Sequence, residues 1–304
     1  MKNLLYIISL CGLLTACDLQ EEPYGFYSDD NFYKSETDAE SGLLYAYNAL
    51  TFLEYSRGIF YIGDIPTETM SPKSDEAGDV YQLENWIANR ETEQLQYYFK
   101  YCYIAINRAN TVIDHIQNSS ALSETARRRI LGEAYFLRGF NYLKLVSQYG
   151  GVPLKLESSF VPVREFTRAT AEATVEQAIG DLKNAYDLLP ATVSMVGKIS
   201  RDAAAHFLAK AYLFRASEIN DGWNSTTKES DLKEALKLAK EVISRHQLAP
   251  NFSDLWHYTE PDGASEKLDE IILSAQFSSD KSSRSAGTNR CHLFFLSVYN
   301  NLPQ

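Results

Sequence analysis

The sequence predicts a mainly all-α fold, a helical-repeat scaffold with long loops and a minor β element near the C-terminus. Three observations lead to this prediction. Apolar residues recur at helical spacing from about Thr37 to His246. A hydroxyl residue followed by an acidic residue precedes several of these runs, and glycine or proline follows them. Alanines fill the apolar faces of the later runs, which lets consecutive helices pack closely.

The first helix is predicted to begin at Thr37, which can form a capping box with Glu40. Glycine and proline then interrupt the periodic pattern over residues 56–92, so this stretch is predicted to be a long loop. Loops of this length are uncommon in compact domains unless they carry function. Residues 56–92 are therefore a candidate binding surface.

The remaining helices fall into candidate pairs. They are predicted over residues 97–117, 123–149, 170–189, 200–217 and 231–246, with Ser123, Thr170, Ser200 and Ser230 at their starts. The pair 97–117 with 123–149 and the pair 200–217 with 231–246 are similar to helix–turn–helix units of the tetratricopeptide (TPR) kind, although no strict repeat period is present. Beyond them, the apolar run at residues 270–277 predicts a strand.

The N-terminus has the layout of a secretory signal. Lys2 precedes an apolar run that is too short to span a bilayer. Leu14-Thr15-Ala16-Cys17 then resembles a bacterial lipobox, in which lipid is added to the cysteine sulfur before the chain is cut. We therefore expect a signal peptide over residues 1–16 and a mature protein over 17–304, anchored to a membrane through acyl chains such as palmitate on Cys17. The alternative is an ordinary cleaved signal in which Cys17 is incidental.

Composition and motifs argue against several classes of function. The net charge of −11, without basic clusters, argues against nucleic-acid binding, which depends on cationic contacts to phosphate. The five histidines are scattered without metal-site spacing, so we expect no metal and no other cofactor. Cys11 leaves with the signal, and Cys102 and Cys291 are expected to be buried thiols. Because G-x-S-x-G and H-E-x-x-H motifs are absent from the sequence, we expect no enzyme, although a carboxylate pair for glycoside hydrolysis stays open.

Several segments together resemble one protein family. Besides Cys17 and the acidic residues behind it, they are Tyr103–Asn110 (YIAINRAN), Glu133–Phe140 (EAYFLRGF), Gln148–Leu154 (QYGGVPL), Ala178–Leu182 (AIGDL) and Ala203–Phe214. The combination is similar to the N-terminal helical region of SusD/RagB nutrient-binding lipoproteins over nearly all of residues 17–280.

This resemblance implies a TPR-like scaffold whose loops bind glycans or related oligomers. It also implies a surface-exposed place on the outer membrane and a lid-like partnership with a SusC-like TonB-dependent transporter. Family members are usually much longer and have a loop-rich C-terminal part that supplies much of the ligand site. The present chain, which ends at Gln304, is therefore expected to lack that part.

Candidate ligand-binding residues are exposed aromatic side chains in loops, since sugars stack on flat rings. We expect Trp86 to act in this way, with Tyr81, Asn85 and Arg90 beside it. The alternative for Trp86 is that it starts the next helix and packs inward. A second candidate is Trp256 with Tyr258.

Two further features favour simpler interpretations. Trp223 lies in a predicted turn, where partner contact or packing is expected. The acidic residues Asp75, Glu76 and Asp79 lack EF-hand spacing, which favours a solvated loop over a calcium site.

Three functional hypotheses follow. The leading one is a non-enzymatic receptor that binds an oligosaccharide or other oligomeric nutrient and delivers it to the transporter. The alternative is a TPR-like protein-interaction scaffold without a sugar site. A surface glycoside hydrolase has the least support.

Overall fold

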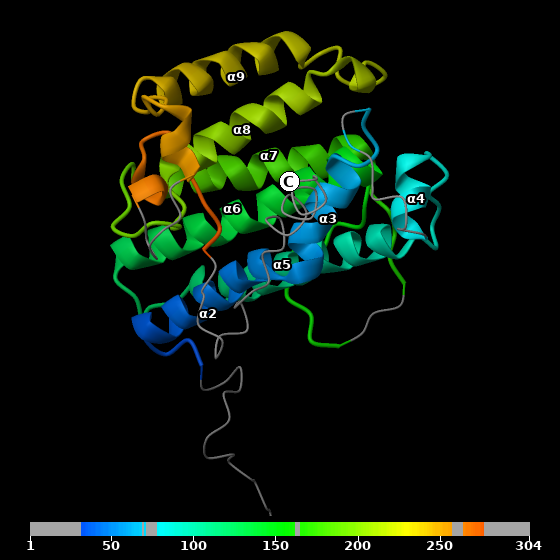
Figure 1. Cartoon of the computed structure of the whole chain (residues 1–304). Coiled ribbons are helices and arrows are strands. Elements are labelled where there is room, and N and C mark those ends of the chain that lie inside the picture. Colours follow the sequence, from blue (N-terminus) through cyan, green and yellow to red (C-terminus); the bar gives the residue numbers. More distant parts are fainter. Residues whose placement is uncertain (1–31, 69, 71–77, 162–164, 257–263, 277–304) are drawn as a thin grey trace, which may run out of the picture. The chain divides into compact units, whose positions relative to one another are not determined.

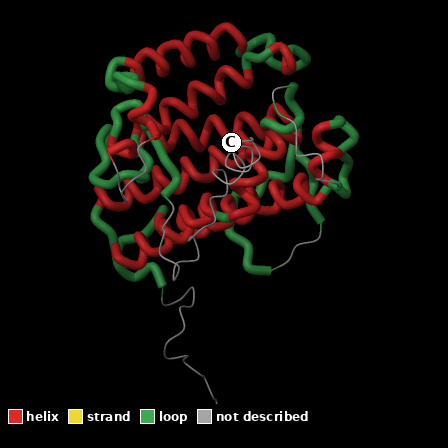
Figure 2. Tube along the Cα trace, in the orientation of Figure 1, coloured by secondary structure: helices red, strands yellow, loops and turns green. Residues whose placement is uncertain are grey.

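Helices make up the regular structure of the chain in the computed structural model, which describes residues 32–68, 70, 78–161, 165–256 and 264–276 (Figure 2). Within these ranges no strand is found, so the mainly α-helical fold is confirmed. The helices are α2 (Glu36–Asn48), α3 (Leu53–Gly63), α4 (Asp79–Glu84), α5 (Glu93–Ile116), α6 (Glu124–Tyr149), α7 (Ala171–Leu188), α8 (Arg201–Arg215) and α9 (Lys228–Ile243). Short 3-10 turns are η1 (Ala49–Thr51), η2 (Glu218–Asn220), η3 (Phe252–Trp256) and η4 (Ala264–Lys267).

Consecutive helices from α5 to α9 lie side by side, so that each packs against the next one in the chain (Figure 1). Helix α2 packs against α5 and α6, and α3 packs against α5. Because sequence neighbours are also spatial neighbours, the main core is a continuous apolar layer, with Ile106, Phe136, Leu182 and Ala204 among its fully buried side chains. None of the described helices combines the length and apolar character needed to cross a membrane.

Three of the predicted helix starts are confirmed by their caps. The side-chain oxygens of Ser123, Thr170 and Ser200 each accept a hydrogen bond from a backbone N–H three residues later. These bonds satisfy backbone donors that have no partner within the helix. Helix α6 ends at Tyr149, directly before Gly150 and Gly151, in keeping with the prediction that glycine or proline follows the helical runs.

Three other predicted starts are wrong. The helix predicted from residue 97 begins at Glu93. The cap of α2 lies two residues before Thr37, with Ser35 and Asp38 as the capping box. Helix α9 begins at Lys228, and the hydroxyl of Ser230 inside it donates to the carbonyl of Thr227 at 2.7 Å. A hydroxyl that bonds backward to a carbonyl does not cap the N–H groups ahead of it, so the local residue type misplaces the start.

The predicted long loop over residues 56–92 is wrong in part, because two of its stretches are helical. It contains residues 56–63 of α3 and all of α4. Gly58, taken as a loop signal, lies where α3 meets α5, and a Cβ atom there would be 2.7 Å from Cδ2 of Tyr98. The glycine therefore serves close packing between helices and does not break α3.

The predicted strand over residues 270–277 does not form in its described part, residues 270–276. A strand needs a neighbouring strand to complete its hydrogen bonds. Here Ile272 and Leu273 instead pack against the helical core.

Cys102 is fully buried and unpaired, and burial raises the pKa of its thiol to about 12, as expected for a structural thiol. Cys291 lies outside the described residues.

Candidate functional site

The corner formed by α3, α4 and the start of α5 has an apolar cluster of its own. Its buried members are Tyr61, Ile65, Val80 and Leu83, and they are separate from the main core. The short helix α4 is thus held by packing against the end of α3. The N-terminal end of α4 is also bonded to α5. The Asp79 carboxylate accepts a 3.1 Å hydrogen bond from the backbone N–H of Gln94 in the first turn of α5.

Trp86 follows the end of α4 in a Schellman motif. Its N–H donates to the carbonyl of Leu83 at 3.3 Å, and the N–H of Ile87 donates to the carbonyl of Gln82 at 3.0 Å. This motif places the residue after the helix cap in the left-handed backbone region, where glycine is usual. Trp86 accordingly has a φ of +59°. A side chain in this conformation costs about 1–2 kcal/mol relative to glycine.

The indole of Trp86 is 80 % exposed. A large apolar ring that is both exposed and held in an unfavourable backbone conformation contributes little to folding stability. Such a combination is typical of a residue kept for function. The alternative in which Trp86 starts the next helix and packs inward is wrong, because α5 begins only at Glu93.

A cavity of about 450 Å³ lies beside Trp86. Its walls come from the end of α3, from α4 and from the facing turns of α5 and α6, and they include Ile62, Pro66, Leu83, Leu95 and Gln148. The cavity is therefore mostly apolar, with the amide of Gln148 as one polar group. An exposed ring beside an apolar cavity that carries an amide suits a sugar, whose C–H faces stack on rings and whose hydroxyls need polar partners.

The connection from α4 to α5 is ordered by short polar contacts. The Asn89 N–H donates to the hydroxyl of Thr92 at 3.0 Å, and that hydroxyl donates to Oε1 of Gln82 at 2.6 Å. Asn89 Oδ1 accepts from the N–H of Glu91 at 2.8 Å. The Thr92–Gln82 bond ties the connection to α4, and the two bonds of Asn89 order the connection itself.

The residues predicted to accompany Trp86 lie on the same corner. Tyr81 is about half exposed on α4. The Asn85 amide donates to the Tyr81 carbonyl at 2.9 Å, so this donor already has a partner. Arg90 is largely exposed, and its nearest carboxylate is Glu91 at 3.6 Å.

The second predicted pair does not join this site. Trp256 belongs to η3, beyond α9, and its ring lies 5.7 Å from that of Phe252. Among the described residues, the side chains that line the Trp86 cavity all precede Gly150 in the chain. Tyr258 lies outside the described residues, as do Asp75 and Glu76. Trp223 is partly buried against the main core, which fits packing.

Sequence reasoning missed the walls of the cavity. Ile62 and Leu95 carry no local signal of a binding role, since apolar residues at helical spacing are usually core. Gln148 belongs to the family-like stretch Gln148–Leu154, and that membership is the one signal in the sequence that could have found it.

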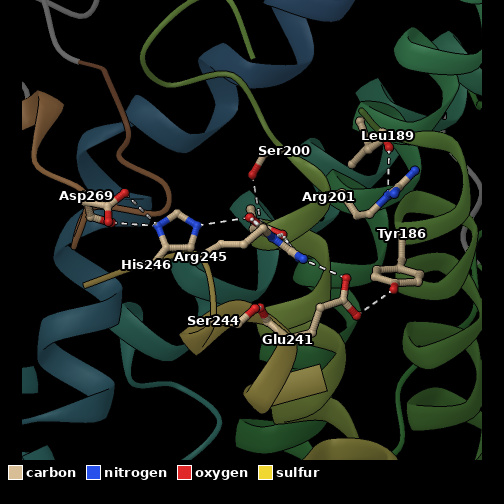
Figure 3. A network of polar contacts seen from close by, with 11 residues as sticks. Tyr186, Leu189, Ser200, Arg201, Glu241, Ser244, Arg245, His246 and Asp269 are labelled. Atoms are coloured by element: carbon tan, nitrogen blue, oxygen red, sulfur yellow. Dashed lines mark hydrogen bonds and ion pairs between the residues drawn. The ribbon is translucent and has the colours of Figure 1, made fainter. Parts of the chain in front are cut away.

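A separate polar network joins α8 and α9 to the chain around Asp269 (Figure 3). Arg245 donates to both carboxylate oxygens of Asp202 and, at 2.9 Å, to Glu241. His246 Nε2 lies 3.1 Å from Asp202, and its Nδ1 lies 2.7 Å from the carbonyl oxygen of Asp269.

Burial alone would raise the pKa of Asp202, but the hydrogen bonds from Arg245 and His246 outweigh it and lower that pKa. The Asp202 carboxylate is already paired with Arg245 and His246. The network therefore has a structural role, in which it holds α8, the end of α9 and the chain around Asp269 together. Within the described residues no group of three or more His, Cys, Asp or Glu side chains is arranged to hold a metal ion.

The comparisons with known proteins agree with the fold. The family model described as "Starch-binding associating with outer membrane" matches residues 30–213. A SusD-like protein from Bacteroides ovatus is 30% identical over 277 residues, which cover 85% of this chain and 47% of that protein. A SusD homolog from Bacteroides thetaiotaomicron has a TM-score of 0.69 at 22% identity, covering 84% of this chain and 50% of that one.

A further structure, solved with a xylogluco-oligosaccharide, has a TM-score of 0.70 at 24% identity and covers 83% of this chain and 48% of that one. The chain thus spans about half the length of these relatives. The two structures show a shared fold. The family model covers more than half of this chain, and together with the relative from Bacteroides ovatus it settles the family. The chain therefore belongs to the SusD/RagB family.

Proposed function

We propose that this chain is a non-enzymatic glycan-binding protein of the outer membrane, and that glycan stacks on Trp86 beside the 450 Å³ cavity. The observation that carries the proposal is the exposed indole of Trp86 in a strained backbone conformation. The family description as starch-binding and associated with the outer membrane supports it, as does the fold shared with a protein solved with a xylogluco-oligosaccharide.

The same proposal includes the anchor and the partner. The lipobox at Cys17 supports a signal peptide over residues 1–16 and a lipid-anchored, surface-exposed mature protein over 17–304. The consecutive packing of α5 to α9 supports a TPR-like scaffold. Bound glycan would pass to a SusC-like TonB-dependent transporter. Mass spectrometry of the mature protein tests the anchor, because acylation adds the mass of the lipid at Cys17.

Affinity gel electrophoresis in xyloglucan or starch tests the binding site. We expect Trp86→Ala to weaken retention about tenfold, which corresponds to the loss of about 1.4 kcal/mol of stacking. Ile219→Ala is the matched control, because Ile219 is 77 % exposed but lies in η2. Trp256→Ala reports separately on the second predicted platform. Unchanged retention of Trp86→Ala, with an unchanged helical circular dichroism signal in all variants, would remove Trp86 from the site.

A second candidate function is an interaction scaffold without a sugar site. It is favoured by an apolar stripe on the outer face of α9, where Leu232, Leu236 and Ile243 are 47 %, 56 % and 71 % exposed. Co-purification with the transporter by the wild-type chain, and its loss in Leu236→Glu, would support the scaffold. If neither this chain nor Trp86→Ala binds any polysaccharide, the scaffold hypothesis replaces the receptor hypothesis.

A reducing-sugar assay tests the expectation that the chain has no hydrolase activity.

A further inference from the structure

A second cavity, of about 800 Å³, lies away from the Trp86 corner between α2, α5 and the chain that follows α6. Six aromatic residues of the described ranges line it: Tyr33, Tyr45, Phe99, Tyr103, Phe160 and Phe166. Tyr45, Phe160 and Phe166 are each at least half exposed, although rings of this kind usually gather in a core. The volume falls in the range of sites that hold small ligands.

The charged side chains that line this cavity in the described ranges are all cationic. Lys100, Arg108 and Lys155 line it, and no acidic side chain of the described residues does. These three cations also form no ion pair with a carboxylate in the part of the chain that the structure describes, whereas Arg138 and Arg215 each do. A group of unpaired cations is unexpected in a protein with a net charge of −11. The cavity therefore favours an anionic ligand.

Arg108 is held in place with part of its guanidinium free. Its Nη1 donates to the carbonyl of Tyr45 at 2.9 Å and to Oδ1 of Asn48 at 3.3 Å. Its central carbon lies 3.6 Å from the centre of the Tyr45 ring. Both of these hydrogen bonds use Nη1, and neither uses Nε or Nη2. Such a group can donate two parallel hydrogen bonds to one carboxylate or sulfate.

Lys155 is positioned by its backbone. The N–H of Lys155 donates to the hydroxyl of Tyr142 at 2.6 Å. Its carbonyl accepts from the same hydroxyl at 2.8 Å and from Asn110 at 3.0 Å. The Lys155 ammonium lies 4.1 Å from the centre of the Phe166 ring. The Lys155 ammonium and the Phe166 ring therefore lie next to each other in the wall of the cavity.

We infer that this cavity binds an acidic sugar residue, a uronate or a sulfated sugar, as a second glycan site. The C–H faces of the sugar would stack on the exposed rings, and its anionic group would be bound by Arg108 and Lys155. This inference deepens the proposed glycan-binding function and rests on it for the class of ligand. Its residues are different from those of the Trp86 corner, so the two sites can be tested independently.

Isothermal titration calorimetry of the full chain tests the inference. The probes are an oligogalacturonate, a sulfated oligosaccharide and an uncharged xylogluco-oligosaccharide, each at low and high salt. We expect Lys155→Gln to weaken binding of at least one acidic probe about tenfold and to leave the uncharged probe unchanged. High salt should weaken the acidic probe alone. Lys237→Gln, which removes an exposed charge on α9, is the matched control.

Trp86→Ala separates this inference from the proposed function. Loss of the uncharged probe in Trp86→Ala, with the acidic probe retained, supports both sites. If uncharged and acidic probes bind equally, or if Trp86→Ala abolishes both, the acidic-sugar site is overturned and the Trp86 site stands. If Lys155→Gln weakens the acidic probe while Trp86→Ala changes nothing, the Trp86 site fails alone. Tighter binding of a glutamate-rich peptide than of every acidic sugar would also overturn the assignment.

Discussion

Arg138 on α6 and Asp181 on α7 form a buried, bidentate ion pair, in which Nε and Nη2 of Arg138 each lie 2.8 Å from one carboxylate oxygen. Burial alone would lower the pKa of Arg138, but the hydrogen bonds to Asp181 outweigh it and raise that pKa. Nη1 of Arg138 also donates to Asn110 on α5 and to the carbonyl of Leu156. One guanidinium thus joins α5, α6, α7 and the segment that carries Lys155.

Arg138→Met should be strongly destabilising. It leaves the Asp181 carboxylate buried without its cation, which costs about 3–5 kcal/mol. Urea unfolding followed by circular dichroism measures the change. The double variant Arg138→Met/Asp181→Leu should recover part of the loss, because it removes the unpaired charge. A double variant less stable than Arg138→Met would show that the pair itself, and not the stranded acid, provides the stability.

Gly139 is where α6 and α7 approach most tightly around this pair. A Cβ atom at Gly139 would lie 2.9 Å from Cβ of Asp181 and 3.0 Å from the carbonyl oxygen of Ala178. We expect Gly139→Ala to lower the free energy of unfolding by about 1–3 kcal/mol. Gly180→Ala is the control, since nothing lies within 4 Å of its Cβ position on α7, and it should be stabilising by about 0.5–1 kcal/mol. Equal effects of the two substitutions on thermal unfolding would contradict the close contact.

Trp86→Gly should separate stability from binding. Glycine adopts the φ of +59° without penalty. The free energy of unfolding of the variant, measured by denaturant titration, should therefore be about 1 kcal/mol higher than that of the wild type. The same variant should lose glycan retention as Trp86→Ala does. A variant that is less stable than the wild type would mean that the indole contributes packing to α4, and that its strain is no sign of function.

Asp202 should contribute to the pH dependence of stability. Its pKa in the folded protein is lowered below the ordinary value of 3.8, so its contribution is present above that value and is lost as the pH falls through the lower, folded pKa. Asp202→Asn should therefore be less stable at neutral pH, and it should lose less stability than the wild type as the pH falls through the acid range. Thermal unfolding at a series of pH values measures this. Asp187→Asn, an exposed acid on α7, should follow the wild-type curve.

The features predicted well from sequence depend on neighbouring residues. Ser123, Thr170 and Ser200 cap helices through bonds to an N–H three residues away, so the signal and its effect are in the same short stretch. Two of the features predicted wrongly depend on distant partners. Gly58 is a breaker by local rules, but it lets α3 approach Tyr98 of α5. The 270–276 segment has the composition of a strand but lies among helices.

The candidate site shows the same division. Trp86 was identified from its residue type and its place before α5, but its exposure and left-handed backbone follow from the end of α4 and the small apolar cluster beneath it. The aromatic cavity was not predicted at all. Its rings come from residues between Tyr33 and Phe166, and each ring taken alone fits a core position.

By itself the sequence determined the helical class, the starts of α6, α7 and α8, and the family, because these are recorded in short runs of adjacent residues. Only the tertiary structure decided which aromatic rings are exposed, which cations lack a carboxylate, and how Arg138 connects three helices. Those properties depend on burial and on distances between segments far apart in the chain, which helical periodicity does not specify.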